Sequence, residues 1–365
     1  MVKNMPATMT SKAEGKKVRA CKACRVIKVG TDFTGMNSVN VAMKRMLSPD
    51  KFKTVFSSEI LPECKRLQDV MLKDQQPEIE YGDVSDRSIA DMPYVDVYVA
   101  TPPCQTFSNA GKGEGKDDSR GKLLSVAIKY TVTIKPRVMI IENVKGLMLK
   151  KFRPIIKGMT QALTTHGYKV WLRVVNSKDF YVPQSRERVY IVAIRNDSHV
   201  KSFKWPKPCA RVSLSAILDP PAATDLPGRM PQTKTGRKNM NTGCQKAIAL
   251  GVNPLQVPVA IDVDSSAKFF TMGIDEAKTL TRSRGGAKGP WITSRGRRTS
   301  MTELLKLQGF MESEVPWQSA GVSPVQLGRM LGNAVTVPVM GSIISAAMHS
   351  AGITRTAANF PDPRQ

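Results

Sequence analysis

The hydrophobic positions between residues 25 and 195 alternate between two patterns. Short runs rich in Val and Ile are typical of buried strands, and the stretches between them have helical spacing. Strands are expected at 26–32, 53–57, 79–81, 95–100, 138–141, 170–175 and 189–194. Helices are expected over 123–134, over 155–163, and where apolar residues follow the i, i+3, i+4, i+7, i+8 spacing at Val39, Ala42, Met43, Met46 and Leu47.

This alternation predicts an α/β fold with a doubly wound, mostly parallel sheet. Residues 196–298 break the pattern, because they are rich in Pro, Gly, Thr, Lys and Arg and show little periodicity. Ser300 and Ser323 each begin a capping box at the start of a helix, and a last apolar helix follows Pro338. We therefore expect five parts: a basic arm 1–24, a large domain 25–195, an insert 196–298, closing helices 299–350 and a tail 351–365.

Charge narrows the choice of partner, because 55 Lys and Arg stand against 30 Asp and Glu, for a formal net charge of +25. Residues 200–300 hold 17 basic and six acidic residues, and residues 1–28 hold eight and one. Such an excess indicates a polyanion, although a basic surface with no partner is the alternative. About six phosphates are expected to meet one acid-free run of the insert: Arg282, Arg284, Lys288, Arg295, Arg297 and Arg298.

Histidine and cysteine exclude other chemistries. None of the three His has metal-ligand or triad spacing, which argues against zinc hydrolysis and Ser-His-Asp catalysis. The six Cys lack a disulfide spacing and predict a reducing, intracellular setting, with Cys21 and Cys24 read as two thiols in the arm rather than a zinc site. The longest apolar run, 189–194, is too short for a membrane span, and residues 1–28 lack the apolar segment of a secretory signal.

Small and polar residues gather where the expected strands end, which is where doubly wound sheets bind ligands. The first strand leads into Phe33-Thr34-Gly35-Met36, and Gly35 permits a close backbone approach at a helix N-terminus. The second ends at Glu59 and the third at Asp83, whose carboxylates can accept bonds from ribose hydroxyls. This set favours a nucleoside-cofactor site, and an ordinary strand–turn–helix is the alternative.

Two later strand ends and the segment before the strand 189–194 carry candidate catalytic groups. Cys104 follows a Pro-Pro step and precedes the glycine-rich residues 111–115, which suits a nucleophile under a closing lid. Glu142 ends a buried strand, where burial raises the pKa of the carboxyl and lets it donate to a ring nitrogen. Arg186 and Arg188 lie two apart in an extended segment and are expected to point the same way. A structural cysteine and a structural salt-bridge network are the alternatives.

In chain order, six segments resemble the DNA cytosine-5 methyltransferase family, and the likeness runs from about Val26 to Met348 without most of the insert. The segments are Pro103-Cys104-Gln105, Asp118-x-Arg120-Gly121, Glu142-Asn143-Val144, Gln184-x-Arg186-x-Arg188, Arg297 through Phe310, and Gly332-Asn333-Ala334-Val335. The chain departs from the family where Gly35-Met36-Asn37-Ser38 replaces the usual Gly-x-Gly-Gly and the acid is shifted to Asp32. Asn tolerates a positive φ and Ser is small, so the turn can still form.

The resemblance implies a Rossmann-like sheet that binds S-adenosylmethionine and a smaller basic target-recognition domain formed by the insert. It implies that Cys104 adds to C6 of a cytosine, Glu142 acts on N3, and Arg188, supported by Arg186, holds O2. The base must then flip out of the duplex. In the insert, Gln256, Arg282, Arg284 and Arg297 are candidates for DNA contact. Cofactor contacts are implied for Phe33, Thr34, Gly35, Met36, Glu59, Ile60, Asp83, Val84, Pro103, Leu123 and Asn333.

Double-stranded DNA is thus the expected partner and S-adenosylmethionine the expected cofactor, with no metal, no membrane and no obligate protein partner, in a monomer. The expected location is intracellular: cytoplasm or nucleoid in a bacterial or viral setting, nucleus in a eukaryotic one. One alternative is the branch of the family that methylates tRNA, whose associated Cys-Phe-Thr signature is absent. The other is a non-catalytic DNA-binding protein, against which the intact Cys104, Glu142 and Arg188 argue.

Overall fold

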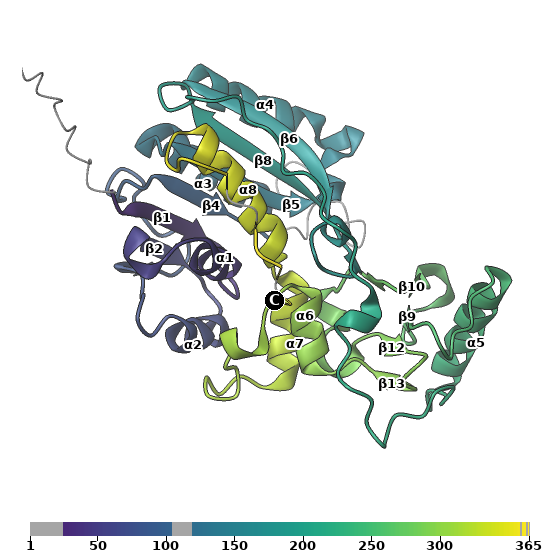
Figure 1. Cartoon of the computed structure of the whole chain (residues 1–365). Helices are drawn as coiled ribbons and strands as arrows, with labels where there is room; N and C mark the ends of the chain where they lie inside the picture. The colour runs from purple at the N-terminus through teal and green to yellow at the C-terminus, as the bar shows by residue number, and fades with distance from the viewer. Residues whose placement is uncertain (1–24, 104–118, 358–359, 363, 365) are drawn as a thin grey trace, which may run out of the picture.

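The computed structural model describes residues 25–103, 119–357, 360–362 and 364. Its main strands are β1 (Ile27–Asp32), β2 (Phe52–Ser58), β3 (Ile79–Tyr81), β4 (Val97–Ala100), β5 (Val138–Val144), β6 (Tyr168–Asn176) and β8 (Glu187–Arg195). They form one sheet in the order β3-β2-β1-β4-β5-β8-β6 (Figure 1). All seven expected strands are present, and the mostly parallel α/β sheet is confirmed.

One strand of this sheet, β8, runs antiparallel to its neighbours β5 and β6, and the other neighbouring pairs are parallel. Residues 177–186 join β6 to β8 and are too few for the crossover that a parallel pair needs. The reversal brings the start of β8 to the end of β5, where Val144 pairs with Arg188. It thereby places Arg188 beside the strand end that carries Glu142.

Helices cover both faces of the sheet (Figure 1). On one face, α1 (Ser38–Met46) and α8 (Val337–Ser350) share an apolar cluster with the strands. On the other face lie α3 (Ser119–Ile134) and α4 (Arg153–Thr165). The expected helices at 39–47, 123–134 and 155–163 are confirmed within a few residues of their ends. The hydrophobic pattern does not predict α2 (Pro62–Met71), because that helix buries only Cys64, Leu67 and Gln68.

Both predicted capping boxes are present. Ser300 caps α6 (Met301–Leu307) and Ser323 caps α7 (Pro324–Asn333), each through reciprocal bonds with the residue three positions later. The stretch Pro324–Ser350, which contains α7 and α8, is long and apolar enough to cross a membrane by length and composition. Because 89% of its apolar window is buried inside the molecule, it is accounted for as core.

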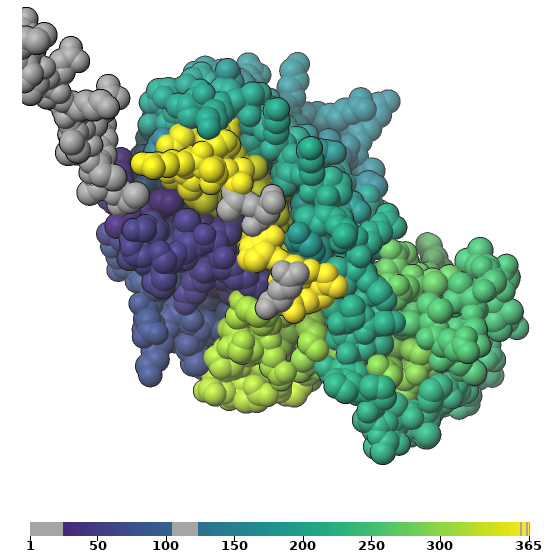
Figure 2. Space-filling view, in the orientation of Figure 1, coloured from purple at the N-terminus to yellow at the C-terminus, as the bar shows by residue number. Residues whose placement is uncertain are grey.

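The insert folds into a lobe of its own at one side of the molecule (Figure 2). It contains α5 (Lys234–Ala249) and a four-stranded sheet in the order β10-β9-β12-β13. The strands are β9 (Val259–Ile261), β10 (Met272–Ile274), β12 (Trp291–Ile292) and β13 (Arg297–Arg298), and β11 (Ala277–Lys278) pairs with β7 (Gln184–Ser185) of the large domain. Strands of two or three residues are too short to display a period of two, which is why the sequence pattern misses them.

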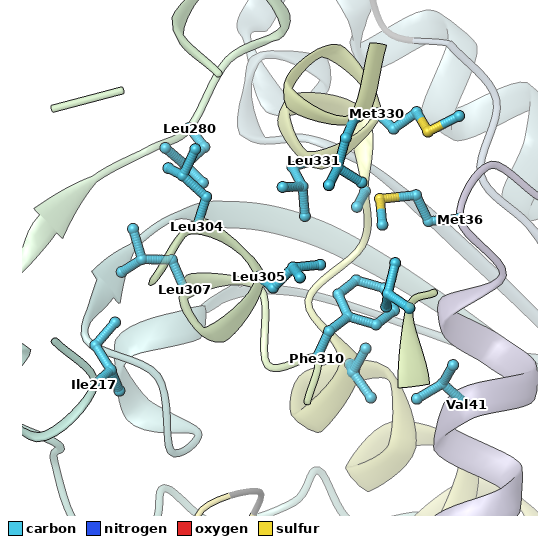
Figure 3. Close-up of a cluster of buried hydrophobic side chains, with 14 of the residues drawn as sticks. Met36, Val41, Ile217, Leu280, Leu304, Leu305, Leu307, Phe310, Met330 and Leu331 are labelled. Carbon is cyan, nitrogen blue, oxygen red and sulfur yellow. The ribbon is translucent and has the colours of Figure 1, made fainter. Parts of the chain in front are cut away.

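The insert joins the large domain through an apolar seam (Figure 3). Leu280 of the insert lies among Leu304 of α6 and Leu331 of α7 in one buried cluster. Next to it the insert backbone lies directly on α7, because a Cβ at Gly328 would fall 2.2 Å from the Gly286 backbone nitrogen. Two glycines one helical turn apart, at 328 and 332, make this close approach possible.

Candidate active site

Three residues in the turn after β1 adopt the left-handed backbone conformation. Phe33, Gly35 and Asn37 have φ values of 58°, 57° and 58°, and the Asn37 side chain caps α1. The expectation that Asn can replace glycine in this turn is therefore confirmed. The Glu59 carboxylate fixes the turn, since one oxygen accepts the Gly35 N–H at 2.7 Å and the other accepts the N–H of Ile60 at 2.9 Å. Glu59 thereby joins the first and second strand ends.

Beneath this turn lies a buried ionic network that the sequence analysis missed. Asp32 accepts bonds from Arg87 (2.7 Å to Nη1), from Ser58 at 2.7 Å and from Tyr98 at 2.5 Å. The Arg87 side chain is 4% exposed, and its guanidinium lies over the rings of Phe56 and Tyr81. Burial, followed by the charge of Asp32, raises the pKa of Tyr98. Asp32 ends an apolar strand, and a buried carboxylate there requires a cationic partner. This requirement is the one feature of the sequence that could have predicted a partner such as Arg87.

A cavity of about 370 Å³ opens at the carboxyl ends of the strands. Most of the predicted cofactor residues line it: Phe33, Gly35, Glu59, Ile60, Asp83, Val84, Pro103, Leu123 and Asn333. Thr34 and Met36 line a small adjoining cavity that shares Phe33, Gly35 and Asn333 with the large one. The structure thus gathers all eleven of these residues in one place.

The cavity suits a nucleoside with a charged tail. Ile60 lines it while remaining 62% exposed, and Phe33 and Leu123 add further apolar wall for a purine ring. The carboxylates of Glu59 and Asp83 offer acceptors for hydroxyl or ammonium groups. Among the described residues, no group of three or more His, Cys, Asp or Glu could hold a metal ion.

Glu142 and Arg188 form an ion pair in the same cavity. Arg188 Nε lies 3.2 Å from Glu142 Oε1, and the two side chains are 15% and 9% exposed. Burial raises the pKa of Glu142, and the nearby charges of Arg188 and Arg186 oppose that rise without cancelling it. A carboxyl with a raised pKa can carry and donate a proton near neutral pH.

Asn143, the residue after Glu142, connects this part of the cavity wall to the segment that follows β4. The Asn143 amide donates to the carbonyl of Pro102 at 3.2 Å and so ties β5 to the segment after β4. Pro103 lines the cavity, and the predicted nucleophile Cys104, which follows it, lies outside the described residues together with the expected lid 111–115.

Arg186 and Arg188 both line the cavity, as expected from their spacing, but they have different partners. The buried Arg186 guanidinium donates to the carbonyls of Leu280 (2.8 Å), Ala334 (2.9 Å) and Gly332 (3.3 Å). The Gln184 amide accepts the Leu280 N–H at 2.8 Å. This motif therefore clamps both backbone groups of Leu280, joining the insert to the catalytic cavity.

The four DNA-contact candidates lie in different surroundings. Arg282 is exposed and lines the cavity, whereas Gln256 is exposed in the loop after α5. Arg284 pairs with Asp262 at 2.8 Å, and Arg297 pairs with Asp225 and with buried Glu303, both at 2.8 Å. The run that is free of acids in the sequence therefore lies beside acidic side chains in the structure, and the expectation of about six phosphate contacts from it stays a prediction.

The fold and the cavity together define an α/β protein with a site suited to a nucleoside cofactor and with a separate lobe formed by the insert. Over residues 32–349 the chain matches the C-5 cytosine-specific DNA methylase family. It is 30% identical to the type II methyltransferase M.NlaX of Neisseria lactamica, over 85% of this chain and 93% of that protein. It is also 30% identical to M.HaeII of Haemophilus aegyptius, over 82% and 86%. The chain belongs to the C-5 cytosine-specific DNA methylase family.

Solved structures share the fold at low sequence identity. The Entamoeba histolytica methyltransferase EhMeth matches with a TM-score of 0.64 and 17% identity, covering 89% of this chain and 98% of its own. A putative DNA modification methyltransferase from an Escherichia coli prophage matches with a TM-score of 0.63 and 18% identity, covering 88% and 98%. By family and relatives, the protein is a DNA cytosine-5 methyltransferase that uses S-adenosylmethionine.

Proposed function

We propose that Cys104, Glu142 and Arg188 carry out the methylation of a flipped cytosine, with Arg186 as a positioning residue. The observation that carries this proposal is the buried Glu142–Arg188 pair, which shares one cavity with nine of the eleven residues expected to contact a nucleoside cofactor. Pro103 lines that cavity, and Cys104 is the next residue in the sequence.

The pair matches the needs of the cytosine ring. C5 is too electron-poor to take a methyl group unaided, so the Cys104 thiolate adds to C6 and forms a C–S bond. The electron pair displaced from the C5–C6 bond moves toward N3, where Glu142 supplies a proton, and C5 becomes nucleophilic. Arg188, which contacts Glu142, would hold O2. After methylation a base removes the C5 proton, the C–S bond breaks, the thiolate leaves, and N3 returns its proton to Glu142.

S-adenosylmethionine supplies the methyl group, as an electrophile on a positively charged sulfur. Phe33, Ile60 and Leu123 would pack on its purine, while Glu59 and Asp83 would accept bonds from its polar groups. The remaining cofactor contacts are those assigned above to Thr34, Gly35, Met36, Val84, Pro103 and Asn333. Because these residues come from several strand ends, the sheet itself sets the distance between cofactor and cytosine.

The substrate is duplex DNA, and the insert 196–298 would choose the target sequence. Its charge and its separate lobe support this role, with Arg282, Arg284, Gln256 and Arg297 as the candidate contacts. The chain is proposed to act as a monomer. Its relatives come largely from bacteria, which favours the cytoplasm or nucleoid of a bacterial host as its location.

A covalent trap tests the assignment of the nucleophile. Duplex DNA carrying 5-fluorocytosine at methylated sites should become covalently bound to the protein when the cofactor is present, because fluorine cannot leave as a cation. Cys104→Ser should bind the same DNA without trapping, since an alcohol is scarcely ionised at neutral pH. Trapping by the Ser variant at the normal rate would exclude Cys104 as the nucleophile.

A further inference from the structure

Arg282 differs from the other arginines of its run. Four of them have acidic partners: Arg284 with Asp262, Arg295 and Arg297 with Asp225, and Arg298 with Asp264. Within the part of the chain that the structure describes, no acidic side chain pairs with Arg282, and its side chain is exposed. A free guanidinium in this setting is available to an external anion.

The backbone that carries Arg282 is held in place. Two residues earlier, both the N–H and the carbonyl of Leu280 are bonded, to Gln184 and Arg186. On α7, a Cβ at Gly332 would lie 2.3 Å from the Arg282 backbone nitrogen, so the segment η7 (Arg282–Arg284) rests directly on that helix. Arg282 therefore projects from a fixed base, although it belongs to the insert.

Its position is at the catalytic cavity. Among the described residues that line the cavity, Arg282 is the one that comes from the insert. The wall it shares includes Glu142 and Arg188, which serve the base, and Asn333, which serves the cofactor. Arg282 is thus an exposed cation at the wall of the cavity in which the base is proposed to bind.

We propose that Arg282 binds the backbone phosphate of the flipped nucleotide. This inference rests on the proposed function, because it assumes a cytosine between Glu142 and Arg188. The phosphate is the charged group of that nucleotide, and a guanidinium can bind two of its oxygens at once. Arg282 therefore captures the extrahelical nucleotide whatever sequence surrounds it, rather than reading a base edge.

The test neutralises one phosphate of the DNA and, separately, the guanidinium of Arg282. Target duplexes, defined first by mapping the cytosines that the wild-type enzyme methylates, would carry a neutral methylphosphonate either 5′ or 3′ of the target cytosine. One of the two should weaken binding by wild type about tenfold, in the range for a charge-assisted bond. Arg282→Gln should weaken binding to the ordinary duplex by a similar factor and should lose its sensitivity to that methylphosphonate.

Lys288→Gln is the matched control, because Lys288 is exposed in the same run and does not line the cavity. This variant should keep the wild-type penalty for the methylphosphonate. Arg282 would be a base reader instead if Arg282→Gln relaxed one position of the target. Its phosphate role would also fail if the penalty persisted undiminished in Arg282→Gln. A wild-type enzyme that methylates no duplex would contradict the proposed function itself, which is a separate outcome.

Discussion

At the scale of single residues, Glu142 gains its chemistry from its place in the sheet. It ends a buried strand, so burial raises the pKa of its carboxyl, and the reversed strand β8 supplies Arg188 at 3.2 Å. The first half of this arrangement follows from the sequence, because a carboxyl after an apolar run lies at a strand end. The ion pair does not, because it depends on the antiparallel register of β5 and β8.

Glu142→Gln tests the proton-donor role. The amide keeps the shape but cannot deliver a proton to N3, so kcat should fall by about 10²–10⁴ with little change in cofactor Kd. In wild type the step should slow as pH rises through the raised pKa of Glu142, because the protonated acid is then lost. Single-turnover rates against pH and calorimetric cofactor titration provide the measurements. An unaltered rate with weakened cofactor binding would make Glu142 a cofactor ligand instead.

The Asp32–Arg87 pair supports the cofactor turn from below. Removing Arg87 leaves a buried carboxylate without its cation, so Arg87→Met should destabilise the fold by about 3–5 kcal/mol in urea unfolding. The double variant Asp32→Leu/Arg87→Met should recover most of that loss, because no unpaired charge remains. If the double variant recovers stability but not cofactor affinity, the Asp32–Arg87 pair is needed for cofactor binding and not only for stability. If the double variant is no more stable than the single one, the network is not a balanced ion pair.

Arg87 also shows what sequence reasoning could not reach at this scale. Most residues predicted for the cofactor follow strand ends, and chain order alone places such residues at one edge of a parallel sheet. Leu123 and Asn333 come instead from the helices α3 and α7. Arg87 lies in a loop without periodicity, 55 positions from Asp32, and only the folded chain brings the two together.

At the scale of elements, the strongest local signals were the reliable ones. The capping boxes at Ser300 and Ser323 each depend on a few neighbouring residues, and both helices begin where expected. Within the insert, α5 and its short strands are stabilised mainly by their shared core of Met240, Ala247 and Ile261, which no local pattern encodes.

The contact between α7 and the insert can be tested through its glycines. Gly328→Ala places a methyl group 2.2 Å from the Gly286 nitrogen, so the 281–286 segment must move away from α7. Turnover on duplex DNA should fall more than tenfold, because Arg282 and the cavity wall move with it, and the melting temperature should drop. Gly158→Ala in α4 is the control, since its new Cβ would meet no atom within 4 Å. The free energy of unfolding of that variant should rise by about 0.5–1 kcal/mol, and its activity should be unchanged. Equal effects of the two substitutions would show that the contact between α7 and the insert is not needed for activity.

At the scale of the whole molecule, the net charge of +25 does not consist of free cations, because four arginines of the insert pair with acidic side chains. The paired arginines of the insert are partly neutralised before DNA arrives. Replacing Arg282 by Gln should therefore lower the slope of log K against log salt by about one, whereas Arg284→Gln should change it much less. Binding titrations between 50 and 200 mM salt, a span of about a factor of four, would measure both slopes. Equal reductions would mean that Arg284 leaves Asp262 to meet the DNA.

The insert consists of a lobe and a segment that packs on the large domain, and exchanging them separately tests which part selects the target sequence. The insert has its own core around Ile261, while Leu280 and the residues after it pack on α6 and α7. Exchanging only residues 219–276 with those of a related methyltransferase of known target removes the Asp219–Lys306 pair but keeps Leu280 and the residues after it on α6 and α7. This exchange should move the methylated sites to the donor's sequence. That outcome is expected because Gln256 lies in the exchanged part, while Arg282 is assigned to a phosphate and Arg297 stays paired with Glu303 of α6. A second chimera that exchanges only 277–298 is the control and should keep the recipient's target. An active 219–276 chimera that still methylates the recipient's sites would show that the lobe does not read the DNA, and a target that moves with 277–298 would return base reading to Arg282 or Arg284.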